Sequence, residues 1–197
     1  AARRFEEEGF DLVLSINISF RQFVGQDLAE LLGQALAESG LAGDRLYFEV
    51  TESMVMGDLA QAQGIMGALR QLGIRFYLDD FGTGHSSLAH LKRLPIDGLK
   101  IDRSFIADLE EDADSRAISR MVVSLAESLN LAIVAEGVET DRQRLLLEEM
   151  DGRGLMLLQG YLFGRPMPLA ELLQRLEADR AGPVPPPGGL PAQSTSL

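Results

Sequence analysis

Short β-rich runs alternate with helical runs along most of this 197-residue chain, and that alternation restricts the fold more than any other feature. Strands that alternate with helices in this way predict parallel β-α-β units. Strands are expected at residues 12–19, 45–52, 75–81, 98–102, 132–138 and 157–164, and helices near residues 27–38, 58–72, 114–129, 140–150 and 168–178.

Residues typical of helix ends support these boundaries. Asp58 and Thr140 stand where N-caps belong, and Gly40 and Gly73 stand where C-caps belong. The expected helix at 114–129 carries apolar side chains at helical spacing, which predicts a stripe facing the core. The members of this stripe are Ile118, Met121, Val122, Leu125 and Leu129.

The end of the chain has a different composition. Residues 180–197 hold five of the eight prolines and almost no core-forming residues, which predicts a disordered Pro/Gly-rich tail. A linker to a further domain is an equally good interpretation. The length of the remaining part, residues 1–179, indicates one domain rather than two.

Polar residues recur near the C-terminal ends of the expected strands. In the segment LVLSINIS, period-two geometry puts Ser15 and Asn17 on the face opposite Ile16. Successive polar positions lie roughly 20 to 36 residues apart, close to the roughly 31 residues per unit of a (β/α)8 barrel. These positions are Asn17, Glu49, Asp79 with Asp80, Lys100, Glu136 and Gln159.

A TIM-like (β/α)8 barrel would bring all of these strand ends to one face, where the active sites of such barrels form. An open doubly wound sheet gives a similar alternation but gathers fewer strand ends in one place. Each residue alone also has a simpler interpretation: Asp79 and Asp80 could form a turn, and Lys100 could be a solvated charge. Their joint occurrence, once per unit, favours a site.

The residue types indicate a centre for hard metal ions. Asn17, Glu49 and Asp79 offer oxygen donors, which suit Mg²⁺ or Mn²⁺. The sequence has no cysteine and only two histidines, so a zinc site is disfavoured. A twist of the loop at Gly82 would let Asp80 face a second metal, and two metals about 3.5–4 Å apart can share a water for phosphoryl displacement.

Lys100 has three chemical interpretations. It could hold that water or neutralise charge on the phosphorus centre. It could instead form a Schiff base with a carbonyl substrate. Carboxylates on successive strands with one Mg²⁺ would also suit stabilisation of an enolate. The adjacent pair Asp79 and Asp80 favours the two-metal interpretation over the other two.

The charge balance narrows the range of partners. The net charge is -12 and the pI is about 4.6, so the surface should repel nucleic-acid polymers. An anionic small substrate would need a metal or a well-placed lysine. No apolar run reaches the roughly 18 residues of a membrane span, and no signal segment opens the chain. The absence of cysteine suits a reducing cytoplasm.

Five segments resemble EAL domains, in the family's order and at nearly its spacing. They are SINISFRQF, FEVTES, YLDDFGTGHSSLAHLKRLPIDGLKIDRSFI, IVAEGVET and QGYLFGRPMP, and they cover roughly residues 5–178. The resemblance implies a TIM-like barrel that hydrolyses cyclic di-GMP to linear pGpG with two Mg²⁺ or Mn²⁺ ions per site. It also implies a homodimer and, in the parent protein, an upstream sensory or GGDEF-type domain. We expect a cytoplasmic domain, with a parent protein that could be membrane-anchored.

The resemblance also implies residue roles, carried over motif by motif. Lys100 resembles the lysine that contacts the catalytic water, and Glu52 resembles the glutamate that braces the loop carrying DDFGTG. That loop is linked in the family to metal binding and dimerisation. The residues that resemble metal or water ligands are Asn17, Glu49, Asp79, Asp80 for the second metal, Glu136 and Gln159.

Three departures from the family pattern carry expectations of their own. The Glu-Ala-Leu motif is absent and should lie upstream of Ala1, so we expect an incomplete barrel without its first strands. The chain alone would then be a weak or inactive enzyme, or a non-catalytic cyclic di-GMP receptor or regulatory dimerisation module. The segment before Gln159 is about three residues longer than usual, and His85 replaces a usual tyrosine, with little expected effect.

Overall fold

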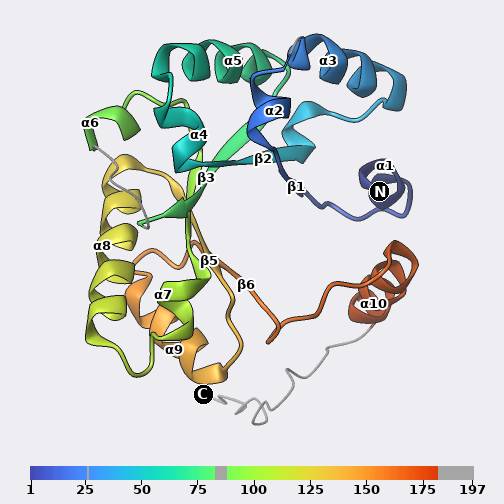
Figure 1. Cartoon of the computed structure of the whole chain (residues 1–197). Coiled ribbons are helices and arrows are strands. Elements are labelled where there is room, and N and C mark those ends of the chain that lie inside the picture. Colours follow the sequence, from blue (N-terminus) through green and yellow to red (C-terminus); the bar gives the residue numbers. More distant parts are fainter. Residues whose placement is uncertain (26, 83–87, 182–197) are drawn as a thin grey trace, which may run out of the picture. The chain divides into compact units, whose positions relative to one another are not determined.

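The structure is a computed structural model that describes residues 1–25, 27–82 and 88–181 (Figure 1). The chain divides into two units. Residues 2–165 form the larger unit, which carries all of the strands, and helix α10 (Leu169–Ala181) belongs to the other. The first two residues of the expected tail, 180 and 181, are thus helical, and the rest of that tail lies outside the described residues.

The larger unit is built on one parallel sheet of six strands. Each strand pairs with its neighbours in the chain, so the strand order is the order of the sequence. A doubly wound sheet would reverse its strand order at the point where the ligand binds. The sequential order and the curl of the sheet confirm an incomplete TIM-like barrel (Figure 1). The strands are β1 (Leu14–Asn17), β2 (Leu46–Thr51), β3 (Arg75–Phe81), β4 (Gly98–Ile101), β5 (Ala132–Glu136) and β6 (Met156–Gln159).

The helices of the larger unit connect these strands. The long ones lie within a few residues of their predicted ranges: α3 (Leu28–Ser39), α5 (Leu59–Gln71), α8 (Ala113–Leu129) and α9 (Asp141–Met150). The short ones gave no periodic pattern because they span few turns: α1 (Ala2–Glu7), α2 (Phe20–Phe23), α4 (Glu52–Met56), α6 (Leu88–Leu91), α7 (Arg103–Ala107) and the 3₁₀ turn η1 (Gly43–Arg45).

Three of the four predicted helix ends are found in the structure, and the fourth, Gly73, lies one residue beyond the observed C-cap. The side chains of Asp58 and Thr140 accept backbone hydrogen bonds at the first turns of α5 and α9. Gly40 ends α3 in the left-handed conformation, with a φ of 69°. The C-cap of α5 is Leu72, and Gly73 follows it with a φ of 90°. These local signals therefore set where the connecting helices begin and end.

The two faces of the sheet differ in chemistry. The outer face carries buried apolar side chains such as Phe48, Leu78 and Ile133, and α5 and α8 pack against it. The predicted core-facing stripe on α8 wrongly includes Met121, whose side chain is 56% exposed. The side of α8 that is buried carries Ser115, Ser119, Val122, Val123 and Ala126. Its small side chains allow close approach to the sheet, while Met121 lies outside this set.

A stacked tyrosine pair lies on the inner face, before the strands reach their C-terminal ends. The rings of Tyr47 and Tyr77 are 5.0 Å apart and nearly parallel. Gly98 on the neighbouring strand leaves room for Tyr77, since a Cβ atom at this position would lie 2.3 Å from a ring carbon. The glycine of the GLKID segment is therefore required by packing rather than by backbone conformation.

We predict that Gly98→Ala lowers the free energy of unfolding by about 1–3 kcal/mol, because the added methyl group overpacks the tyrosine ring. Urea unfolding followed by circular dichroism measures this loss. Gly64→Ala is the matched control: it adds the same methyl group in α5, where nothing lies within 4 Å. It should stabilise the chain by about 0.5–1 kcal/mol. Equal effects of the two substitutions would contradict the packing argument.

Candidate metal centre

Four consecutive strands each place one charged side chain on the inner face. Glu49 lies on β2, Asp79 on β3, Lys100 on β4 and Glu136 on β5, near the C-terminal end of each strand. The alternation of side chains along each strand puts these residues on the face opposite the apolar core. The parallel arrangement then gathers strand ends that are far apart in the sequence at one edge of the sheet.

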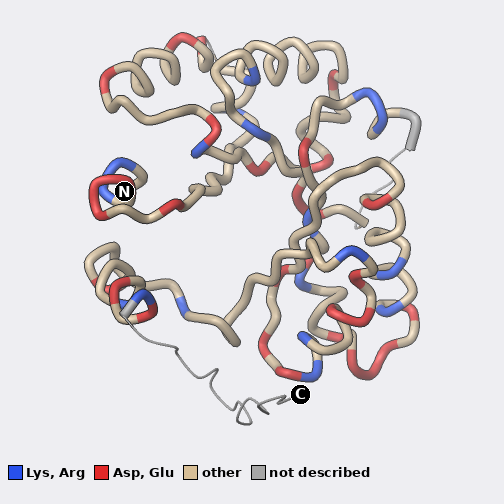
Figure 2. The backbone as a smooth tube through the Cα atoms, turned by 180° about the vertical axis from the view of Figure 1, so that it is seen from behind, with Lys and Arg blue, Asp and Glu red and all other residues tan. Residues whose placement is uncertain are grey.

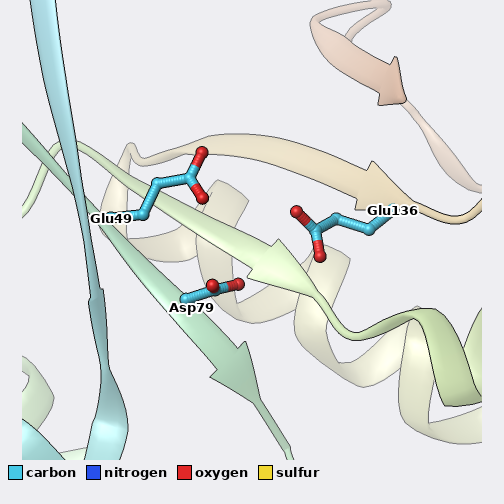
Figure 3. Close-up of side chains that lie close together, drawn as sticks. All are labelled: Glu49, Asp79 and Glu136. Carbon is cyan, nitrogen blue, oxygen red and sulfur yellow. The ribbon is translucent and has the colours of Figure 1, made fainter. Parts of the chain in front are cut away.

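The three acidic residues converge (Figure 3). One carboxylate oxygen from each of Glu49, Asp79 and Glu136 lies within 4.8 Å of those of the other two. Glu49 and Asp79 are buried, at 7% and 9% exposure, and Glu136 is partly buried. Carboxylates held this closely repel one another unless a cation lies between them. A centre of this kind is therefore built to hold positive charge.

Lys100 supplies positive charge in the structure. Its ammonium group is hydrogen-bonded to Glu49 and forms ion pairs with Glu49 Oε2 and Glu136 Oε1, and it lies 3.3 Å from Asp79 Oδ1. The side chain is only 3% exposed. Burial by itself lowers the pKa of Lys100, but the hydrogen bonds to Glu136 and Glu49 outweigh it and raise this pKa above its usual value. Lys100 is therefore a permanent cation at neutral pH.

The pKa of Glu136 is shifted by its surroundings. Burial raises the pKa of Glu136, the contact with Lys100 opposes this, and the charges of Asp79 and Glu49 raise it further. The net direction is upward. Glu136 therefore takes up a proton more readily than an ordinary glutamate, and a bound cation would favour its ionised form.

Amide side chains flank the carboxylates at the ends of the two outermost strands. The strand register places Asn17 of β1 opposite Glu49 and Gln159 of β6 opposite Glu136. The longer segment before Gln159 thus leaves this residue at the same edge of the sheet as the acids. The ligand roles of Asn17 and Gln159 stay predictions, with their positions given by the register.

Asp80 does not join the three-carboxylate group. Its φ of 55° puts it in the left-handed region, where the register between β3 and β4 becomes irregular. Its carboxyl group forms a hydrogen bond with Asp102 instead. Burial raises the pKa of Asp80, and the charges of Asp79 and Asp102 raise it further. Its role as a ligand of a second metal stays a prediction.

Glu52 begins α4, directly after β2, and is buried. Its Oε2 atom has no hydrogen-bond partner within the described ranges. The residues that the resemblance assigns to the loop braced by Glu52 include Thr83, Gly84 and His85, which lie outside the described residues. The bracing role stays a prediction.

Ser15 was not singled out from the sequence as a functional residue. Its hydroxyl group donates a hydrogen bond to Oε1 of Glu49. The same period-two alternation that identified Asn17 also puts Ser15 on the inner face, so a signal was available. A cavity of about 320 Å³ adjoins this contact and is lined by Ser15, Glu49, Lys100 and Gln159 together with Val13, Tyr47, Tyr77, Val134, Leu157 and Leu158.

The buried acids differ from the acidic surface. Asp and Glu outnumber Lys and Arg by 30 to 18 in the sequence, and Figure 2 shows acidic residues spread along the described chain. Exposed carboxylates of this kind are solvated and contribute little to a site.

Among the described residues, none of the helices is both long and apolar enough to cross a membrane.

The chain belongs to the EAL domain family, whose model matches residues 1–166. It is 45% identical over 163 residues to the bifunctional diguanylate cyclase/cyclic di-GMP phosphodiesterase MucR of Pseudomonas aeruginosa, covering 83% of this chain and 23% of MucR. The chain spans about a fifth of the length of the curated relatives it matches. Family membership, expected from the motifs, is thereby confirmed, and relatives in this family are named as cyclic di-GMP phosphodiesterases.

Two solved structures are similar in fold. One is described as PaMucR phosphodiesterase in a c-di-GMP complex, with a TM-score of 0.82 and 43% identity, covering 86% of this chain and 68% of that chain. The other is the manganese/cy-diGMP complex of Klebsiella pneumoniae BlrP1, with a TM-score of 0.73 and 33% identity, covering 84% of this chain and 41% of that chain. The half-barrel of this chain is therefore the EAL fold over most of its length.

We predict that Lys100→Met lowers the free energy of unfolding by about 3–5 kcal/mol near pH 7.5, because three close carboxylates lose their shared cation. The pKa of Glu136 then rises further, and a carboxyl group with a raised folded-state pKa destabilises the fold as the pH rises through that value. The deficit should therefore shrink at about pH 5. It should also shrink on addition of Mn²⁺ near pH 7.5.

The matched control is Lys92→Met, which removes the other lysine of the sequence at an exposed position. Its effect should stay within about 0.5 kcal/mol at either pH. Urea unfolding of both variants and the wild type gives the comparison. A Lys100→Met deficit of the same size at both pH values would show that lost packing, rather than uncompensated charge, causes it.

Proposed function

We propose that this chain carries the greater part of a catalytic domain that hydrolyses cyclic di-GMP to linear pGpG. The observation that carries the proposal is the convergence of Glu49, Asp79 and Glu136 around Lys100 at the ends of four consecutive strands. Membership of the EAL domain family and the cyclic dinucleotides in the two similar structures support the same substrate.

The donor set fits a hard divalent cation. All three converging groups are carboxylates, and their oxygens are close enough together for one ion to contact them all. Two Mg²⁺ or Mn²⁺ ions per site are proposed, by resemblance to the family and in line with the manganese in the BlrP1 structure. Asn17 and Gln159 would add ligands for these ions, and Asp80 would have to exchange its bond with Asp102 for the second one.

Divalent ions in this centre would supply a Lewis acid, which lowers the pKa of bound water and polarises a phosphoryl oxygen. The side chains supply the remaining requirements of the reaction. Glu49 and Asp79 are buried, which restricts their motion and keeps bulk water away from their oxygens. The rigid, preformed placement of charge favours a reaction in which negative charge builds up at phosphorus.

Lys100 is the residue proposed to handle the water. Its ammonium group stays protonated, so it donates hydrogen bonds and does not act as a base. A hydrogen bond from Nζ orients the attacking water and offsets charge on the phosphoryl oxygens. The new P–O bond forms as the P–O3′ bond breaks, which leaves the 5′-phosphate and the free 3′-hydroxyl of pGpG. The attacking water gives up one proton as its bond to phosphorus forms, and the leaving 3′-oxygen takes up one proton, so the step consumes no net proton.

Several finer features also belong to the proposal. Glu52 is proposed to brace the loop that follows β3, and that loop is proposed to contribute to a homodimer.

An upstream sensory or GGDEF-type domain is proposed for the parent protein, in line with the bifunctional name of MucR. A cytoplasmic location is proposed, in line with the absence of cysteine from the sequence. A cavity of about 320 Å³ beside Lys100 is large enough for part of such a ligand.

We predict that, in this chain extended by a Glu-Ala-Leu segment and incubated with cyclic di-GMP and Mn²⁺, Asp79→Asn lowers the rate of pGpG production at least about 100-fold, because it removes a charged ligand of the ion that activates water. Chromatographic separation of the nucleotides measures the product. Asp179→Asn makes the same chemical change at an exposed position on α10 and should leave the rate unchanged.

Two readouts separate this proposal from a non-catalytic receptor. Calorimetry in Ca²⁺ reports binding of cyclic di-GMP, and chromatography in Mn²⁺ reports turnover. Binding without turnover, in this chain and in the same chain extended by a Glu-Ala-Leu segment, would favour the receptor. Absence of both in the extended chain would reject cyclic di-GMP as the ligand. Wild-type turnover by Asp79→Asn would reject the proposed metal centre.

A further inference from the structure

Ser15 holds one oxygen of the most buried carboxylate in the centre. Its hydroxyl group donates to Oε1 of Glu49, while Oε2 of Glu49 accepts from Lys100. The two partners come from different strands, β1 and β4, on either side of β2. Within the described part of the chain, these are the side chains that hydrogen-bond to Glu49.

Lys100 alone does not fix the orientation of the Glu49 carboxylate. Its ammonium group is shared among Glu49, Asp79 and Glu136, so its contact with Glu49 is one of three. The terminal torsion of a glutamate is also broad, which leaves a carboxylate with a single partner free to turn. A second hydrogen bond, on the other oxygen, sets the plane of the group.

The strand register explains why Ser15 reaches this oxygen. Ser15 is aligned with Tyr47, two residues before Glu49 on the same face of β2, and Asn17 is the residue aligned with Glu49 itself. Side chains on one face lean along the strand and meet diagonal neighbours. Ser15 therefore supports the acid from one side and leaves Asn17 available for a ligand role.

We propose that Ser15 is a positioning residue for a divalent cation in this centre: its hydroxyl group orients the Glu49 carboxylate toward Asp79 and Glu136. This inference rests on the proposed function, which supplies the cation. Hydrogen-bond partners of metal-ligating carboxylates are commonly required for tight binding, and their removal typically weakens metal affinity about 10–100-fold. Ser15 does not contact the substrate or the reacting atoms in this proposal.

The test is direct binding of Mn²⁺ to the purified chain, with free Mn²⁺ followed by electron paramagnetic resonance. We expect Ser15→Ala to weaken the apparent affinity about 10-fold, at the lower end of that range, because Lys100 still holds the second oxygen. Ser15→Thr keeps the hydroxyl group and introduces a β-branched side chain suited to a strand, so its affinity should stay within about twofold of wild type. The matched control is Ser124→Ala, at an exposed position on α8.

Each outcome decides the inference. Weak binding by Ser15→Ala, rescue by Ser15→Thr and an unchanged urea midpoint for both would support it. Wild-type affinity in Ser15→Ala would overturn it and leave the phosphodiesterase proposal standing. Equal weakening in both Ser15 variants would also overturn it, since the shape of β1 rather than the hydroxyl group would then be responsible. A wild-type chain without saturable Mn²⁺ binding would overturn this inference and the proposed metal centre together.

Discussion

The contact between one ammonium group and three carboxylates governs the inner face of this half-barrel. Burying Lys100 is costly unless anions surround it, and burying Glu49 beside Asp79 is costly unless a cation lies between them. The carboxylates therefore make the burial of Lys100 possible, and Lys100 makes the burial of the carboxylates possible. The curl of the sheet is what allows four consecutive strands to deliver these groups to one point, because a flat sheet would hold Glu49 and Glu136 far apart.

The same period-two alternation serves both faces of the sheet. On the outer face it supplies the apolar side chains that pack against α5 and α8, and on the inner face it supplies the tyrosine stack and then the charged centre. The inner face is thus ordered along the strand direction. Tyr47 and Tyr77 lie below the charged level and line part of the cavity beside Lys100, and Gly98 leaves room for the Tyr77 ring. On the inner face, the tyrosines pack earlier along the strands and the charged side chains follow near the C-terminal ends. The acids of the centre therefore occur only near those ends.

The features that follow from local pattern were predictable from the sequence. Strand β3 was predicted at its observed bounds, and the caps Asp58 and Thr140 were identified because a cap depends on its own helix. Features that depend on tertiary contact were not. Met121 was wrongly included in the core-facing stripe of α8, because helical periodicity alone does not show which side of the helix is buried. The bond from Ser15 to Glu49 depends on strand register, which one strand alone does not specify.

The geometry also opposes one of the three chemical interpretations of the lysine. A Schiff base requires a neutral amine, and the acids around Lys100 raise its pKa, so its environment opposes that chemistry. The choice between one metal and two rests on Asp80. In the structure its carboxyl group is turned to Asp102, and burial together with the charges of Asp79 and Asp102 raises its pKa. A second cation at Asp80 would have to break that bond. In the proposed two-metal mechanism, a first ion would meet three carboxylates that already converge, whereas a second would need a rearrangement at the end of β3.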